Sequence, residues 1–455
     1  MFGTSGIRGP VGETVTADLA LAVGRAVATD GAERVVLARD ARDSGRFLAD
    51  AVAAGCVECG ADVIDLGQVA TPTAARSIAR LDADAGVVVT ASHNPPEDNG
   101  LKLWTPSGQA FDTARRARIT EIIENDDYTF TAWDAVGRRR TDSDAHAAHT
   151  EAVVNAIGTD ETIADETHER LSDLHAVVDV GNGVGGVTAD ALGELGVSVT
   201  TLNAQPDGSF PGRPSEPTAE TLTTLCGQVG ATDADLGIAH DGDADRMVAV
   251  DETGTFVPKD VLLALFARQA VAGADGGVVA APVDTSRAVD DAIEPLGGRL
   301  TRTKVGDVFV AEAATREEVV FGGEPSGAWI WPDETLCPDG SLAAARLAAL
   351  VASEGSLSAQ AAEIDTYPIR RESIEVDEKA AVMDRVADAM AADYEGVDTK
   401  DGVRVATETG WILVRPSGTQ PLIRVTAEAR TEAAADDLLA AAVERVEAVA
   451  EELPA

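Results

Sequence analysis

Three aspartates alternate with small residues in a segment that reads DGDADR: Asp241, Asp243 and Asp245. Apolar runs at 236–239 and 247–250 flank this segment, which predicts a loop between two strands in which the carboxylates converge. Carboxylate oxygens at this density suit Mg²⁺ or Ca²⁺. The spacing also matches an EF-hand calcium loop, but Arg246 stands where that loop needs glycine, and its flanks should be helices. We predict a divalent-metal site here, with a solvated acidic turn as the alternative.

A serine stands at the end of another apolar run. Ser92 lies in the segment TASHNPP, directly after a predicted strand at 86–89. Pro95 and Pro96 fix their φ angles, so the loop that carries the hydroxyl should be rigid. We interpret the hydroxyl as a candidate nucleophile; an ordinary turn residue is the alternative.

A glycine-rich loop, GGEPSG, follows the apolar run 319–321. Its glycines, Gly323 among them, permit close backbone approach, while Glu324 and Ser326 offer polar groups to a ligand. By itself this segment also fits an ordinary turn.

The segment RPSGT combines a guanidinium, two hydroxyls and a glycine-exposed backbone directly after a predicted strand at 411–414. Such a set forms a concave site suited to a phosphate dianion. Its candidate anion-binding residues are Arg415, Ser417, Gly418 and Thr419. The chain has no GxxxxGK[ST] motif, which excludes a P-loop nucleotide site. A GxGxxG match at 181–186 lacks the acidic residue that would hold a ribose hydroxyl, so we interpret it as a tight turn.

A weak internal repeat positions these loops. Three times, a buried strand is followed by a polar or glycine-rich loop, an Ala/Leu-rich helical stretch, a glycine and a second strand. The strand pairs are 35–40 with 62–66, 177–180 with 197–202, and 278–283 with 299–303. The repeat predicts an α/β protein with three similar mixed-sheet domains whose strands are mainly parallel.

The chain after Pro368 follows a different pattern, which predicts a smaller α+β domain. Its expected elements are a strand at 369–376, a helix at about 378–394, short strands near 403–407, 411–414 and 422–427, and a closing amphipathic helix. The predicted domains are I (1–145, nucleophile loop), II (146–250, metal loop), III (251–365, GGEPSG loop) and IV (366–455, phosphate loop). The polar stretch 141–149 is the expected linker between the first two.

The composition limits the partners. The 455 residues include 78 Asp and Glu but only 36 Lys and Arg, which gives a net charge of -42. We expect no binding to nucleic acid or anionic membranes, because such binding depends on Lys and Arg that neutralise phosphates. A uniformly acidic, lysine-poor chain is typical of salt-loading halophiles, where molar salt screens self-repulsion. The hydrophobic content of 45% argues against disorder.

Cysteine usage and hydropathy indicate where the protein works. Four scattered cysteines are too few for a disulfide framework, which indicates a reducing compartment. Cys56 and Cys59 form a single CxxC pair, which we interpret as buried structural thiols rather than a zinc or redox site. No secretory h-region and no run of about 18 uncharged apolar residues is present. We expect a soluble, cytoplasmic protein.

Taken together, the motifs FGTSGIRG (2–9), TASHNPPEDNGLKL, DGDADR, GGEPSG and RPSGTQP, in this order, resemble the α-D-phosphohexomutase superfamily. The resemblance spans essentially the whole chain. It implies three similar α/β domains and a smaller fourth domain around a central cleft, in agreement with the repeat.

The resemblance also implies roles for individual residues. Ser92 would be the phosphorylated serine, and the three aspartates would hold one Mg²⁺ together with a phosphoserine oxygen. The other catalytic residues would be Arg8, His93, Lys102 and Arg246, with Arg8 and Lys102 as general acid/base candidates. Sugar recognition would fall to Gly323, Glu324 and Ser326. The phosphate that is not reacting would be held by Arg415, Ser417, Gly418 and Thr419.

The implied reaction exchanges sugar 6-phosphates and 1-phosphates through a sugar 1,6-bisphosphate, which serves as intermediate and activator. The FGTSGIRG opening and the segment 304–307, KVGD, look most like the phosphoglucosamine mutase branch. Ala328 and Gln420 depart from residues common in the family, so a phosphomannomutase/phosphoglucomutase of broad specificity is the alternative. A third reading is a sugar phosphatase that uses the same serine. Monomer and homodimer both remain open.

Overall fold

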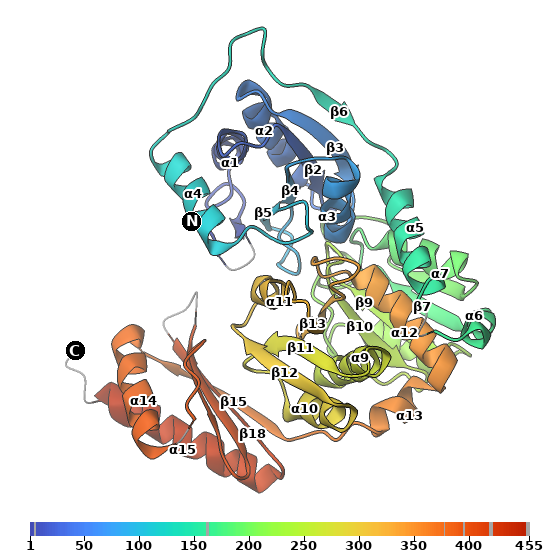
Figure 1. The fold of residues 1–455 in the computed structure, drawn as a ribbon, viewed down its shortest axis with the longest axis vertical. Coiled ribbons are helices and arrows are strands. Elements are labelled where there is room, and N and C mark those ends of the chain that lie inside the picture. Colours follow the sequence, from blue (N-terminus) through green and yellow to red (C-terminus); the bar gives the residue numbers. More distant parts are fainter. Residues whose placement is uncertain (4–5, 161–162, 377, 395, 418–421, 452–455) are drawn as a thin grey trace.

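The computed structural model describes residues 1–3, 6–160, 163–376, 378–394, 396–417 and 422–451. It contains four sheets, one in each predicted domain, which follow one another along the chain (Figure 1). Three sheets carry helices in α/β units, and the C-terminal sheet packs against α14 and α15. The predicted fold class is confirmed. The domain boundaries stay predictions.

Domain I is built on a six-stranded mixed sheet in the order β1-β5-β4-β2-β3-β6. Its strands are β1 (Ile7–Pro10), β2 (Arg34–Arg39), β3 (Asp62–Gln68), β4 (Ala85–Val89), β5 (Asp98–Trp104) and β6 (Arg139–Thr141). Its helices are α1 (Ala17–Thr29), α2 (Gly45–Glu58), α3 (Thr71–Arg80) and α4 (Thr113–Glu124). β4 is buried along its whole length, as a run of β-branched residues in the middle of a covered sheet should be.

Domain II has the sheet order β10-β9-β7-β8. Its elements are α5 (Ala145–Gly158), α6 (Asp165–Leu171), β7 (His175–Asp179), α7 (Gly186–Glu194), β8 (Ser198–Leu202), α8 (Thr223–Gly230), β9 (Leu236–His240) and β10 (Met247–Asp251). Part of the stretch predicted as a linker is helical: α5 begins at Ala145, and His149 is buried within it. Hydrogen bonds from its ring to Thr73 and Asp339, far away in the sequence, explain why a polar segment folds inward.

Domain III has the sheet order β12-β11-β13-β14. Its elements are α9 (Lys259–Gly273), β11 (Gly277–Pro282), α10 (Arg287–Ile293), η1 (Glu294–Leu296), β12 (Gly298–Thr303), α11 (Asp307–Ala313), β13 (Val319–Glu324), β14 (Ala328–Ile330), α12 (Gly340–Glu354) and α13 (Leu357–Ala362).

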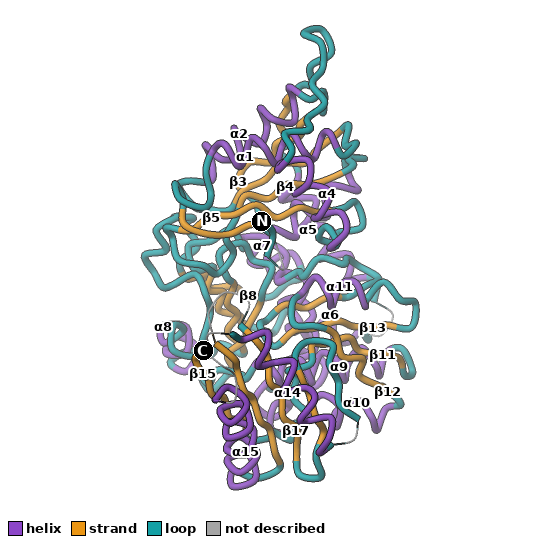
Figure 2. Tube along the Cα trace, turned by 90° about the vertical axis from the view of Figure 1, so that its left-hand side faces the viewer, coloured by secondary structure: helices purple, strands orange, loops and turns teal. Residues whose placement is uncertain are grey.

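Domain IV is an antiparallel sheet in the order β15-β18-β17-β16. Its elements are β15 (Ile369–Glu375), α14 (Lys379–Asp393), β16 (Val403–Ala406), β17 (Gly410–Pro416), β18 (Leu422–Ala429) and α15 (Glu432–Glu451). This domain lies at the opposite end of the molecule from α1 and α2, as the view turned by 90° also shows (Figure 2). No helix in the described ranges is long and apolar enough to cross a bilayer.

The internal repeat is confirmed in the topology of the first three domains. In each, two strands pair in parallel with a central strand, and a fourth strand closes one side as an antiparallel hairpin. The hairpins are β4–β5, β9–β10 and β13–β14. Ser92, the three aspartates and the GGEPSG segment each lie at one of these hairpins, so the repeat places three different loops at equivalent positions.

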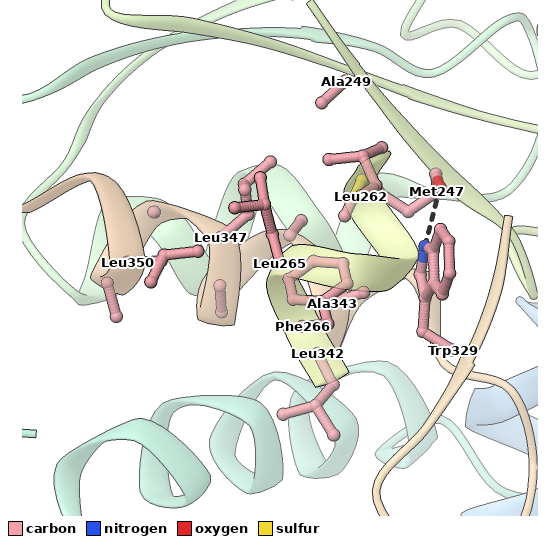
Figure 3. Close-up of a cluster of buried hydrophobic side chains, with 14 of the residues drawn as sticks. Met247, Ala249, Leu262, Leu265, Phe266, Trp329, Leu342, Ala343, Leu347 and Leu350 are labelled. Atoms are coloured by element: carbon pink, nitrogen blue, oxygen red, sulfur yellow. Dashed lines mark hydrogen bonds between the residues drawn. The ribbon is translucent and has the colours of Figure 1, made fainter. Parts of the chain in front are cut away.

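Domains II and III share one hydrophobic core, which fixes two of these loops relative to each other. Helices α9 and α12 each contribute more of its buried residues than any other element, among them Leu262, Phe266 and Leu347 (Figure 3). Trp329 of β14 is buried in this core, and its Nε1 donates to the carbonyl oxygen of Met247 in β10, 2.8 Å away. The metal loop and the GGEPSG loop therefore emerge from a common, closely packed support.

Candidate active site

Ser92 is held in an unusual backbone conformation between β4 and β5. Its φ is 54°, in the left-handed region that non-glycine residues seldom adopt, and its side chain is buried. Its hydroxyl donates to Oδ2 of Asp241 across the domain boundary, at 2.7 Å. Such strain persists where the surroundings determine it and is common at functional sites.

Asp40 and Arg42 hold the Ser92 loop in place through buried hydrogen bonds, and neither residue was predicted from the sequence to belong to the site. Both side chains are fully buried, and Arg42 Nε donates to Asp40 Oδ2 at 3.0 Å. Asp40 also accepts from the hydroxyl of Thr90 at 2.7 Å. The Arg42 guanidinium donates to four carbonyl oxygens of the loop, those of Ser92, Asn94, Pro95 and Asp98. The sequence signal that could have found them is a charged pair at the end of the predicted buried strand 35–40, since Ser92 also lies at the end of a predicted buried strand.

The three aspartates of the metal loop converge. Asp241, Asp243 and Asp245 are all buried, and one oxygen of each lies within 4.8 Å of the others. Burial, together with the two neighbouring carboxylates, raises the pKa of Asp241 well above its usual range. Oδ1 of Asp243 is buried and has no hydrogen-bond partner among the described residues. A hard divalent cation fits this set, because it would satisfy that oxygen and offset the repulsion.

Two donors from domain I reach the same carboxylate of the metal loop. Lys102 Nζ pairs with Asp243 at 2.7 Å and also with Asp245. The hydroxyl of Thr71, at the start of α3, donates to Asp243 Oδ2 at 2.6 Å. Burial would raise the pKa of Asp243, but these donors outweigh it and hold that pKa below its ordinary value. Thr71 also escaped the sequence analysis, since a threonine at a helix start has no local feature that predicts this distant contact.

The remaining catalytic candidates surround Ser92. Arg8 lies on β1 opposite Gly100, and its Nε is buried without a partner in the described parts of the chain. Nδ1 of His93 lies 3.5 Å from Ser92 Oγ, and burial with nearby arginines lowers the pKa of His93 to about 2. Arg246 approaches Asp241 Oδ2 to 4.0 Å through its Nε. The structure therefore gathers Arg8, Lys102 and Arg246 around the Ser92 and metal loops. Arg415, the predicted phosphate-binding arginine, lies apart from them in domain IV.

The GGEPSG loop is attached directly to the metal loop. The backbone N–H of Met247 donates to the carbonyl of Gly327 at 2.9 Å, and Arg246 forms a β-bridge with Ala328. β13 extends through Glu324, so part of the predicted loop is strand. Gly323 is buried, and a Cβ there would lie 2.4 Å from Leu263, which gives this glycine a packing role.

Glu324 is the carboxylate of this loop. Its Oε1 accepts from the backbone N–H of Gly306 at 2.9 Å, and its Oε2 accepts from the Ser326 hydroxyl at 2.7 Å. Burial and the nearby Asp307 raise the pKa of Glu324 to about 7. It therefore changes charge near neutral pH.

The phosphate loop is described only at its edges. Arg415 lies near the end of β17 and pairs with Asp401 at 2.9 Å, and its Nε is buried without a partner in the described ranges. Ser417 is buried, and Lys379 Nζ donates to its carbonyl oxygen at 2.6 Å. Gly418 and Thr419 lie outside the described residues, so their assignment stays a prediction.

Comparison with known proteins connects this geometry to a family. Residues 1–130, 149–254 and 258–367 match the alpha/beta/alpha domains I, II and III of phosphoglucomutase/phosphomannomutase, and residues 373–445 match its C-terminal domain. The chain belongs to this family. It is therefore a phosphosugar mutase, and the superfamily resemblance seen in its motifs is confirmed.

Relatives and solved structures agree with this assignment. A protein named probable phosphoglucosamine mutase from Methanopyrus kandleri is 46% identical over 442 residues, 96% of this chain and 95% of that protein. One of the same name from Methanobrevibacter smithii is 42% identical, with 94% of each chain covered. A phosphoglucomutase/phosphomannomutase family protein from Burkholderia thailandensis superposes with a TM-score of 0.86 at 27% identity, covering 99% of both chains. N-acetylphosphoglucosamine mutase from Aspergillus fumigatus, solved with GlcNAc-6P and magnesium, shares the fold at a TM-score of 0.59 and 20% identity, covering 99% of this chain and 96% of that one.

Proposed function

We propose that this mutase interconverts glucosamine 6-phosphate and glucosamine 1-phosphate, with Ser92 as the residue that carries the phosphoryl group. The single observation that supports it most is the 2.7 Å contact between the buried Ser92 hydroxyl and Asp241, within a triad of convergent carboxylates. The names of the relatives supply the choice of amino sugar.

The charges around Ser92 suit a phosphoserine. A phosphorylated serine carries roughly -1.5 to -2 charges, and beside three buried carboxylates it needs compensation. Asp241, Asp243 and Asp245, with an oxygen of phosphoserine 92, would hold one Mg²⁺, which neutralises charge and orients the transferring group when bound. The cations Lys102, Arg8 and Arg246 supply further positive charge from the protein itself.

A phosphoryl group moves from Ser92 to the sugar, and a phosphoryl group later returns from the sugar to Ser92. A sugar hydroxyl oxygen attacks phosphorus, the bond from phosphorus to Ser92 Oγ breaks, and the hydroxyl proton passes to a nearby base while the serine oxygen regains a proton. The product is a sugar 1,6-bisphosphate. After it turns over in the cleft, its other phosphoryl group returns to Ser92 by the reverse step. We assign the proton transfers to Arg8 and Lys102 and propose His93 as a neutral neighbour of the reacting oxygen.

The two ends of the sugar need different partners. Glu324 and Ser326 would accept and donate hydrogen bonds to sugar hydroxyls beside the metal loop, with Gly323 shaping the strand behind them. Arg415, Ser417, Gly418 and Thr419 would hold the phosphate that is not reacting. One fixed anion site can hold either phosphate, because the bisphosphate turns over between the two transfers while the site stays in place.

The finer properties of this enzyme are also proposals. We propose that it works in the cytoplasm as a phosphoprotein, that sugar 1,6-bisphosphate activates it by phosphorylating Ser92, and that it binds neither nucleic acid nor membranes. Monomer and homodimer both fit the sequence. The acidic surface favours a salt-adapted protein.

The test is direct isomerisation in molar salt. Purified enzyme with Mg²⁺ and a trace of bisphosphate should convert glucosamine 6-phosphate to the 1-phosphate, followed by ³¹P NMR, and intact mass with peptide mapping should find phosphate on Ser92. Ser92→Ala should abolish turnover. Isomerisation by Ser92→Ala at the parent rate would defeat the proposal.

Two outcomes would favour the alternatives. Equal kcat/KM on glucosamine, glucose and mannose phosphates would indicate a phosphomannomutase/phosphoglucomutase of broad specificity. Release of inorganic phosphate faster than isomerisation would indicate a phosphatase.

A further inference from the structure

One carboxylate oxygen joins domain IV to domain III beside the proposed substrate site. Asp401, in the segment between α14 and β16, pairs through Oδ2 with Arg415 Nη2 at 2.9 Å. The same oxygen accepts from the backbone N–H of Val305, also at 2.9 Å, across 96 residues of sequence. Both side chains of the ion pair are about three-quarters buried, with exposed fractions of 24% for Arg415 and 22% for Asp401.

The contact continues into the sugar loop. The next backbone N–H along the chain, that of Gly306, donates to Glu324 Oε1 at 2.9 Å, and Glu324 Oε2 accepts from Ser326. Gly306 has a φ of 131°, which a residue with a side chain would adopt only under strain. This conformation directs two successive amides to two carboxylates in different domains.

Apolar packing supports the same junction. The side chain of Val305 packs against a small cluster formed by Val283 of domain III with Trp411 and Leu413 of β17. Arg415 is the penultimate residue of β17, which ends at Pro416. The polar bridge at Asp401 therefore has a packed base, and it forms a continuous set of contacts from the phosphate-loop arginine to the sugar-loop carboxylate.

We propose that Asp401 is a positioning residue. It aligns Arg415 with the phosphate that is not reacting, and it connects this phosphate site to the sugar loop. The inference rests on the proposed function. A guanidinium held at one nitrogen keeps its other donors in a fixed plane, and Arg415 Nε, buried and without a partner in the described ranges, is one such donor. One set of contacts then positions both the residues that bind the sugar and the arginine that binds its distant phosphate.

The experiment uses the full-length enzyme and two matched substitutions. Asp401→Asn keeps an acceptor oxygen for Val305 but removes the charge that holds Arg415. Asp398→Asn is the control, because Asp398 lies three residues away in the same segment and, within the described part of the chain, its side chain bonds only to Lys400. We expect Asp401→Asn to raise KM for glucosamine 6-phosphate about ten-fold, with a smaller fall in kcat. The inhibition constant of inorganic phosphate should rise in parallel, and Asp398→Asn should stay within about two-fold of the parent.

A double-mutant cycle separates alignment from general destabilisation. If Asp401 acts through Arg415, adding Asp401→Asn to Arg415→Lys should raise KM little beyond Arg415→Lys alone. The inference would be overturned if the two substitutions changed KM by independent factors that simply multiply in the double variant. Equal KM values for Asp401→Asn and Asp398→Asn would overturn it as well. If the parent enzyme fails to isomerise glucosamine 6-phosphate, the proposed function fails instead. Calorimetric binding of inorganic phosphate to the parent and to Asp401→Asn would then still decide the role of Asp401.

Discussion

Replacing Arg42 by methionine tests whether the buried pair with Asp40 holds the Ser92 loop in its strained conformation. Methionine keeps an apolar stem of similar reach but removes every donor. Asp40 would lose its counter-charge in a site where both side chains are fully buried, and burial already raises the pKa of Asp40. The carbonyl oxygens of Ser92 and Asn94 would lose donors at 2.9 and 2.6 Å.

The expected magnitude follows from this burial. Breaking a buried pair by removing one partner costs about 3–5 kcal/mol, because the other charge is left uncompensated. Arg39→Met is the matched control: Arg39 lies three residues earlier and is only half-buried, and among the described residues its side chain makes one hydrogen bond, to the carbonyl of Asp40 at 3.3 Å. It should cost less than about 1 kcal/mol.

Hydrogen exchange is the suitable assay, because a four-domain chain need not unfold in a single step. Amides in residues 90–100 should exchange faster in Arg42→Met by a factor that corresponds to several kcal/mol, and turnover should fall with them. Adding Asp40→Asn should restore part of the protection, since the uncompensated charge is removed. Equal protection in Arg42→Met and Arg39→Met would refute the reasoning.

Three further predictions concern the metal, pH and salt. Asp243→Asn should weaken Mg²⁺ binding and sharply reduce turnover, because Asp243 supplies a buried oxygen that has no partner among the described residues; titration calorimetry with Mg²⁺ checks this, and near-normal affinity would remove the metal assignment. Because the pKa of Glu324 is raised to about 7, its acceptor charge develops as pH rises through neutrality. KM for the sugar phosphate should therefore fall from about pH 6 to about pH 8, and Glu324→Gln should flatten this trend, whereas an identical pH profile in that variant would contradict the assignment. With a net charge of -42, the thermal unfolding temperature should drop when salt is dialysed from molar to millimolar, as the Debye length grows from about 3 Å to tens of ångströms; an unchanged temperature would exclude salt adaptation.

The sequence by itself determined the central strands, the loops at their ends and the family, but not β1, β5, β6 and β14. Short apolar runs predicted β4, β9 and β10. Ser92 follows β4, and the aspartates lie between β9 and β10. These signals are local, because side-chain type and spacing specify a strand and the residues at its end. The repeat also predicted three similar units, since each unit repeats the same local pattern.

Only the tertiary structure decided which side chains meet. Asp398 and Asp401 look alike in sequence, yet only Asp401 bridges Arg415 and a backbone amide from domain III. Arg42 likewise reaches carbonyl groups about 50 residues away. Such contacts depend on how sheets, helices and domains pack, and a charged residue in the chain has no local feature that records its distant partner. Burial then sets the strength of each contact, and burial is a property of the assembled fold.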